Sequence, residues 1–145
     1  MTKWLIVTLL SIVIVAAAKP GQDASAEWKK LAGTWRLIDE IDDGTRTPAG
    51  LAKKDKLTFD LIGAWKVESD GKIVGEGTAT IDPTKKPKTI DYTITKGEAA
   101  GTKFLAIYEL DGDVFRHCGI LNGARPSKFL SEPGSKQILT VFRRQ

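Results

Sequence analysis

The single histidine of the chain, His117, directly precedes its single cysteine, Cys118. A Cys–His pair serves some enzymes as nucleophile and base, and both side chains are common zinc ligands. Here, however, they lie in a segment whose residues alternate as in a β-strand, where neighbouring side chains point to opposite faces. The two groups therefore do not converge on one substrate or ion. We expect Cys118 to be a buried packing residue.

Other catalytic patterns are missing from the sequence. It contains no Gly-x-Ser-x-Gly nucleophile elbow, no phosphate-binding Walker loop and no dinucleotide-binding fingerprint. One histidine does not build a histidine-rich metal site, and Asp111-Gly112-Asp113 is short for a calcium loop and typical of a hairpin turn. We therefore expect no catalytic residues, no metal and no cofactor, and interpret the protein as a non-enzyme.

The acidic residues Asp39, Glu40, Asp42 and Asp43 cluster at the end of the first expected strand. At such a place carboxylates are normally solvated. Asp39 differs, because strict alternation puts it on the same face as Trp35 and Leu37. If the strands close into a β-barrel, we expect Asp39 to lie inside that barrel or at its rim.

The first 18 residues have the layout of a secretory signal peptide. A basic start with Lys3 leads into the apolar run 4–16, and Ala16-Ala17-Ala18 offers small residues for cleavage. Thirteen residues fall short of the roughly 17–25 that a membrane-spanning helix needs. The sequence predicts cleavage near Ala18, export to the periplasm or the exterior, no stable membrane span afterwards, and a mature domain of residues 19–145. An uncleaved membrane anchor is the alternative.

The mature chain would carry 21 basic and 18 acidic residues, a formal charge of +3. The basic residues are scattered among acidic ones, except at Lys85-Lys86-Pro87-Lys88 and Arg143-Arg144, and no aromatic residues are interleaved with them on one surface. Nucleic acid is therefore not an expected partner. A single cysteine cannot form an internal disulfide, so this exported domain must be held together by packing. At this length a monomer can bury a sufficient core.

After a loose leader and a short helix that Asp23 or Ser25 caps and that runs to about Ala32, the pattern is alternating to the end of the chain. Turn signals, among them Asp70-Gly71 and Asp111-Gly112, separate the alternating runs. The predicted strands are residues 34–42, 57–61, 64–68, 72–81, 89–95, 103–110, 114–120 and 138–143, with loops over 45–56 and 122–135. About eight short strands joined mostly by hairpins predict an all-β, antiparallel up-and-down barrel. A sandwich is the alternative.

Gly33-Thr34-Trp35, just behind the expected helix, resembles the Gly-x-Trp signature of lipocalins. The stretches LAGTWRL, IDPTKKPKTIDYTI, YELDGD and RPSKFLSEPGSKQILTVFRR are together similar to an uncharacterised lipocalin-like domain family that is numerous in planctomycete bacteria. This resemblance covers about residues 28–144. It implies a lipocalin-like barrel in an exported protein, in which the Trp35 ring packs at the closed end beneath Arg144 or Arg143, and it implies no activity or ligand. His117 departs from the pattern, because an apolar residue is more typical at its position.

The interior of an eight-stranded barrel either is filled by side chains or holds one small ligand. The candidate interior residues are Trp35, Phe59, Trp65, Tyr92, Tyr108, Phe115 and His117. We expect the domain to bind a small apolar or amphipathic molecule there, with His117 as a polar group in an apolar cavity. The alternative is a module with a filled core that interacts with, or inhibits, a protein of the cell envelope. Interior volume discriminates between the two.

Overall fold

The computed structural model describes residues 20–52 and 54–145, so the predicted signal peptide lies outside the described residues. Its nine strands form one antiparallel sheet in which β1 pairs with both β3 and β9, and this closes eight of the strands into a barrel. The strands are β1 (Gly33–Asp42), β2 (Thr45–Arg46), β3 (Asp55–Phe59), β4 (Ala64–Ser69), β5 (Lys72–Asp82), β6 (Lys88–Gly97), β7 (Lys103–Asp111), β8 (Val114–Leu121) and β9 (Ile138–Arg144). The predicted up-and-down barrel with a short N-terminal helix is confirmed.

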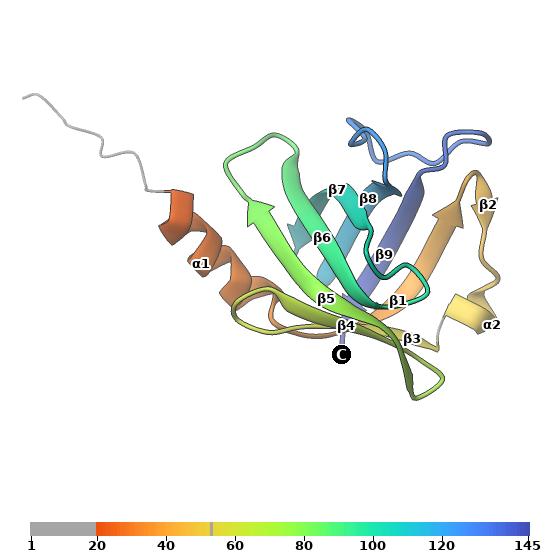
Figure 1. Cartoon of the computed structure of the whole chain (residues 1–145), viewed down its shortest axis with the longest axis horizontal. Helices are drawn as coiled ribbons and strands as arrows, with labels where there is room; N and C mark the ends of the chain where they lie inside the picture. Colours follow the sequence, from red (N-terminus) through yellow and green to blue (C-terminus); the bar gives the residue numbers. More distant parts are fainter. Residues whose placement is uncertain (1–19, 53) are drawn as a thin grey trace, which may run out of the picture.

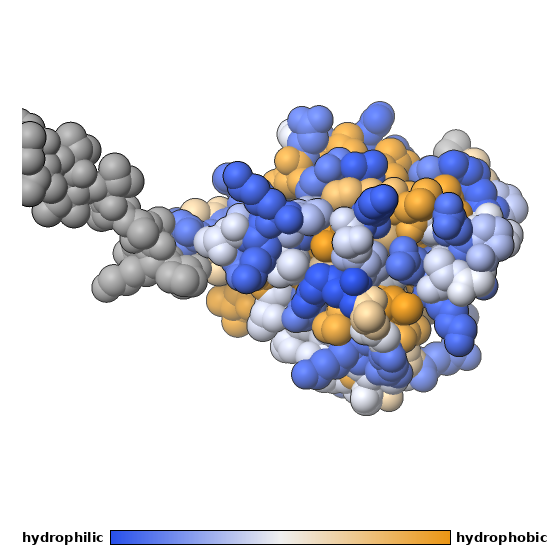
Figure 2. Space-filling view, turned by 90° about the horizontal axis from the view of Figure 1, so that it is seen from above, coloured by the Kyte–Doolittle hydropathy of each residue, from blue (hydrophilic) through white to orange (hydrophobic). Residues whose placement is uncertain are grey.

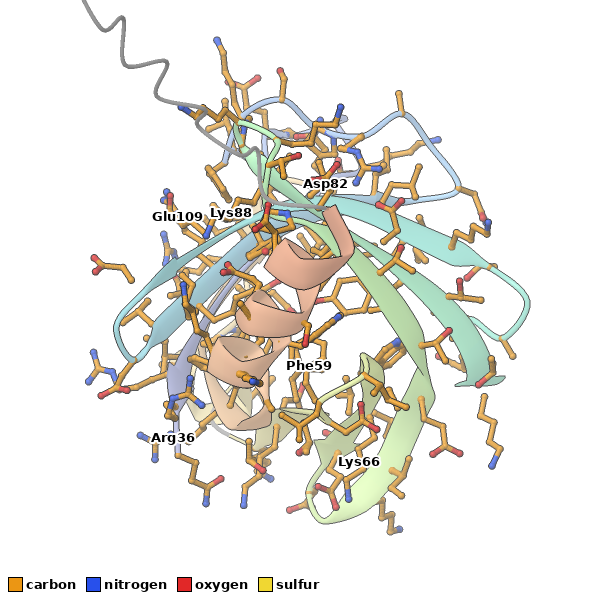
Figure 3. The ribbon with its side chains drawn as sticks, turned by 90° about the vertical axis from the view of Figure 1, so that its left-hand side faces the viewer. Arg36, Phe59, Lys66, Asp82, Lys88 and Glu109 are labelled. Carbon is orange, nitrogen blue, oxygen red and sulfur yellow. The ribbon has the colours of Figure 1, made fainter. Side chains whose placement is uncertain are left out.

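The two ends of the barrel differ. Helix α1 (Pro20–Leu31) lies across one end, which we call the closed end (Figure 1). Figure 3 looks onto this end, with α1 in front of the barrel and Phe59 behind it. The opposite end, which we call the open end, is bordered by the β1–β2, β4–β5 and β6–β7 turns, the β8–β9 connection and the short helix α2 (Ala49–Ala52).

The closed end is built around Trp35, whose side chain is fully buried. The Arg144 guanidinium lies 4.1 Å from the centre of the Trp35 ring, in cation–π geometry. Arg144 also donates to the carbonyl oxygens of Lys30 and Ala32, and Trp35 Nε1 donates to that of Leu31 at 2.7 Å. Since the last carbonyls of a helix lack partners within it, Trp35 and Arg144 cap α1 as well as close the barrel. The structure thus identifies Arg144, rather than Arg143, as the partner of Trp35.

The backbone conformation at Gly33 explains why the Gly-x-Trp motif begins with glycine. It joins the end of α1 to β1 with φ at +118°, a conformation that residues with a Cβ rarely adopt. A Cβ there would also come within 3.4 Å of Arg144 Nη1. Glycine therefore allows the sharp change of direction that brings the helix end onto the Trp35–Arg144 pair.

A buried carboxylate fixes α1 from its other side. Glu27 accepts hydrogen bonds from Lys88 Nζ of β6 at 2.7 Å and from the Tyr108 hydroxyl of β7 at 3.2 Å. Lys88 lies beside α1 in Figure 3. Burial alone would raise the pKa of Glu27, but the hydrogen bond and charge of Lys88, together with Tyr108, outweigh burial and hold this pKa below its ordinary value.

We predict that Glu27→Gln lowers the free energy of unfolding at pH 7 by about 1–2 kcal/mol, because it removes charge-assisted hydrogen bonds to a buried group. A carboxylate whose folded pKa is lowered stabilises the fold above the unfolded pKa of about 4.3 and loses this contribution as the pH falls. Urea unfolding at pH 7 and at pH 3 should therefore show a smaller difference between the variant and the wild type at pH 3. Glu68→Gln, at a half-buried residue 3.8 Å from Lys66, is the control and should have little effect. An equal loss at both pH values would contradict this role for Glu27.

The helix and loop predictions need three corrections. Helix α1 begins at Pro20, so Asp23 lies in its first turn and neither Asp23 nor Ser25 caps it. Proline suits this start, because its fixed φ matches a helix and its missing N–H is not needed there. The predicted loop 45–56 contains the short elements β2 and α2 and the start of β3. The predicted strand 57–61 is shifted, because β3 ends at Phe59, so Leu61 lies beyond it and is exposed.

A β-bulge reverses the alternation of β1. The β1–β9 register passes from Leu37–Phe142 directly to Asp39–Val141, so Ile38 has no partner on β9. As a result Asp39 points outward and pairs with Arg46, while Glu40 points into the barrel. The expectation that Asp39 lies on the inner face is therefore wrong. A second bulge, in β5 opposite Val67 and Glu68, likewise turns Ile73 outward, although strict alternation from Gly75 would put its side chain on the inner face.

Residues 122–137, which connect β8 to β9, cover part of the outer surface of the barrel. Cys118, which points outward from β8, is buried under this connection, and its thiol donates to the carbonyl oxygen of Leu130 at 3.3 Å. Arg125 in the same connection bonds to Asp91 and to the carbonyl oxygen of Ala106. Figure 2 looks onto this side of the molecule, where charged and apolar side chains are interspersed.

Candidate ligand cavity

The half of the barrel next to the open end contains a cavity of about 250 Å³. Most of its wall is apolar, and the apolar residues come from almost every strand and from the β6–β7 turn: Leu37, Leu57, Trp65, Val67, Ile94, Ala99, Phe104, Leu121, Ile138 and Phe142. Six polar or charged residues interrupt this wall: Glu40, Asp55, Lys56, Tyr92, His117 and Thr140. The barrel therefore offers a space of the kind that holds a small molecule, with a few polar groups to orient it.

His117 lies in this cavity within a ring of aromatic side chains. The ring centroids of Tyr92, Phe104, Phe115 and Phe142 lie 5.4–5.6 Å from the imidazole centroid. Burial among these groups lowers the pKa of His117 to about 3, because a charged imidazolium would lose its hydration. The imidazole is therefore neutral at pH 7.

A hydrogen bond of 2.9 Å joins the Tyr92 hydroxyl to His117 Nδ1. Burial raises the pKa of Tyr92 well above its ordinary value, so the phenol keeps its proton. The pair is best satisfied when the phenol donates to Nδ1, because its proton then has an acceptor. We therefore assign the imidazole proton to Nε2, the ring nitrogen that Tyr92 leaves free.

Thr140 of β9 is the cross-strand neighbour of His117. Its side chain lines the cavity and is 4% exposed, and its hydroxyl oxygen has no hydrogen-bond partner among the described residues. A buried hydroxyl without a partner costs free energy. Two polar groups, the imidazole and this hydroxyl, thus lie on neighbouring strands in a mostly apolar wall.

Two carboxylates also line the cavity: Glu40 of β1 is the cross-strand neighbour of Thr140, and Asp55 is the first residue of β3. Lys56 is also among the lining residues, but it alternates with the buried Leu57 and lies opposite Arg36 and Glu68, so its ammonium group is on the outer face of β3. The Glu40 carboxylate also accepts a hydrogen bond of 2.8 Å from the Thr47 hydroxyl, which fixes its position. The charged part of the wall is therefore net negative.

The seven predicted interior residues all face the inside of the barrel, but they divide into two groups. Trp65, Tyr92 and His117 line the cavity. Trp35, Phe59, Tyr108 and Phe115 fill the closed half, where Phe115 contacts the rings of Trp35, Phe59 and Tyr108. The closed half is thus a packed core and the open half is hollow.

Several cavity residues were not among the sequence candidates. Thr140 and Phe142 are two positions apart on β9 and therefore share a face, and Phe104 lies on the same face of β7 as Tyr108. Alternation alone could have placed all three inside the barrel. Glu40 could not be found this way, because the bulge at Ile38 changes which side chains of β1 point inward.

Among the described residues, the structure brings together neither a Cys–His catalytic pair nor a metal site. His117 and Cys118 lie on opposite faces of β8, and burial raises the pKa of the Cys118 thiol. Within residues 20–52 and 54–145, no three histidine, cysteine, aspartate or glutamate side chains lie close enough to share a metal ion. The helices of this part of the chain are too short or too polar to cross a membrane.

The chain matches no protein-family model, no curated protein and no solved structure.

Proposed function

We propose that this protein is a non-catalytic, lipocalin-like carrier that binds one small amphipathic molecule inside its barrel. The observation that carries the proposal is the cavity itself, which has an apolar wall and the Tyr92–His117 pair within it. Ligand sites of small molecules typically combine apolar walls with a few fixed polar groups. Fold alone does not determine function, so the argument depends on this site.

The volume limits the size of the ligand. An engineered cavity of about 150 Å³ is large enough for benzene. Pockets for drug-sized molecules start at about 300 Å³. A cavity of about 250 Å³ lies between these values, so we expect a ligand larger than benzene that fills most of the open half of the barrel.

We further propose that the carrier acts outside the cytoplasm. The signal-peptide layout of residues 1–18 and the resemblance to an exported lipocalin-like family support this part. The absence of a catalytic role is supported by the state of the two most reactive residues. His117 is neutral and bonded to Tyr92, and Cys118 faces the opposite side of β8.

The test is native mass spectrometry of the protein, gently purified after export in its own host. We predict a discrete additional mass that disappears on denaturation. Val67→Phe, which adds volume inside the cavity, should lose this mass, while Val141→Phe on the outer face of β9 should retain it. If the wild-type protein carries no additional mass and takes up no added hydrocarbon, the alternative of an envelope-protein interaction module is favoured.

A further inference from the structure

We propose that the cavity selects an uncharged carbonyl compound, whose oxygen accepts hydrogen bonds from His117 Nε2 and from the Thr140 hydroxyl while its apolar body fills the open half. This inference rests on the proposed function and specifies its ligand class. Ketones, aldehydes, esters, lactones and amides share the required chemistry, which is a neutral oxygen with two lone pairs.

The first donor is His117. Tyr92 occupies Nδ1, and the phenol donates in this bond, so the remaining ring nitrogen carries the proton and is a donor. His117 is itself more than nine-tenths buried, and the four aromatic rings around it hold its plane in place. A buried donor of fixed direction favours a ligand that carries an acceptor and disfavours one that leaves the donor unpaired.

The second donor is Thr140, directly opposite His117 on the neighbouring strand. Cross-strand neighbours have Cβ atoms about 4.5–5.5 Å apart, so one oxygen atom can lie between the two side chains. The threonine hydroxyl has no protein partner, and rotation between staggered positions about the Cα–Cβ bond can turn it toward that oxygen. A carbonyl at this place would therefore satisfy both groups.

The charges of the wall favour a neutral ligand over an anion. A buried carboxylate ligand needs a cationic partner, whereas Lys56, the only lysine or arginine among the lining residues, belongs to the outer face of β3, and the carboxylates of Glu40 and Asp55 line the cavity. The imidazole supplies no positive charge at neutral pH, because it is buried. The site can therefore orient a carbonyl oxygen without compensating a carboxylate.

Three probes of similar shape test this inference on the exported protein: acetophenone, α-methylstyrene and benzoate. The first two differ in a carbonyl oxygen against a methylene group, and benzoate adds the charge. Titration calorimetry should show benzoate binding at least about tenfold more weakly than acetophenone, a difference of about 1.4 kcal/mol. His117→Leu and Thr140→Val should each lower the affinity for acetophenone relative to α-methylstyrene by about three- to tenfold, the value of one hydrogen bond. Thr80→Val, at an exposed threonine of β5, is the matched control.

Infrared spectra of bound acetophenone test the hydrogen bonds directly, because substitutions that only alter the fold would not change its carbonyl stretching frequency. The carbonyl stretch of bound acetophenone should be lowered in the wild type and should shift back in both cavity variants. An unchanged affinity ratio in either variant, or benzoate binding as tightly as acetophenone, overturns the inference. If α-methylstyrene binds under those circumstances, or if native mass spectrometry shows an additional mass, the proposed function still stands. Failure of all three probes to bind, together with a bare mass, contradicts both.

Discussion

Replacing Trp35 by alanine is expected to lower the free energy of unfolding by about 3–5 kcal/mol, as for other large truncations in protein cores. The side chain is fully buried, and its ring packs against Phe115 as well as under the Arg144 guanidinium. The substitution also removes the hydrogen bond to the last turn of α1, because Nε1 donates to the carbonyl oxygen of Leu31. The barrel would lose a core residue and a helix cap together.

Urea unfolding followed by circular dichroism measures this loss. Ile62→Ala is a suitable control, since Ile62 is 83% exposed in the β3–β4 turn at the same end of the barrel, and it should change the stability by less than about 0.5 kcal/mol. An unchanged melting temperature of Trp35→Ala would remove Trp35 from the core and would leave the Gly-x-Trp motif without its structural role.

The second large effect is an acid destabilisation that depends on His117. In the unfolded chain the imidazole binds a proton below about pH 6.5, whereas burial keeps the folded imidazole neutral down to about pH 3. Because the unfolded state then binds the extra proton, the stability of the fold decreases as the pH falls through this window. The slope is about 1.4 kcal/mol for each pH unit, so about 2–3 kcal/mol is lost by pH 4.5.

His117→Gln tests this expectation, because glutamine keeps a polar group beside Tyr92 and does not titrate. The free energy of unfolding should fall between pH 7 and pH 4.5 in the wild type and should be nearly constant in the variant. Tyr92, Glu40, Asp55 and Lys56, which share the cavity, are present in both proteins, so the difference isolates the imidazole. Equal pH profiles would show that His117 is hydrated and would also remove the basis for a neutral donor in the cavity.

Most of the architecture could be predicted because alternation and turn residues are local signals. Each of the eight expected strands is present, and the Asp70-Gly71 pair forms the β4–β5 turn. The β7–β8 turn is one residue further along than predicted, at Gly112-Asp113, because Asp111 still pairs with Val114. The role of Trp35 followed from a motif, and the structure added the choice of Arg144 over its neighbour.

The cavity was harder to predict, because it depends on register and on volume. The bulge at Ile38 exchanges Asp39 for Glu40 on the inner face, and no residue type at that position marks it. The presence of an aromatic side chain likewise does not show whether a residue packs in the closed half or lines the cavity. Phe115 and Tyr92 look equivalent in the sequence, yet the first is packed in the closed half and the second lies in the hollow one.

The pairing of β1 with β9 has a consequence for the order of events during synthesis. These strands come from opposite ends of the domain, and the contact between Ala32 and Arg144 spans 112 positions of the chain. Until β9 has left the ribosome, β1 lacks one neighbour, α1 lacks its arginine cap, and the ring cannot close. A growing chain therefore stays incompletely folded until its translation is nearly finished, as expected for folds dominated by distant contacts. Such a delay suits the proposed export, in which the chain would cross a membrane unfolded and fold on the far side.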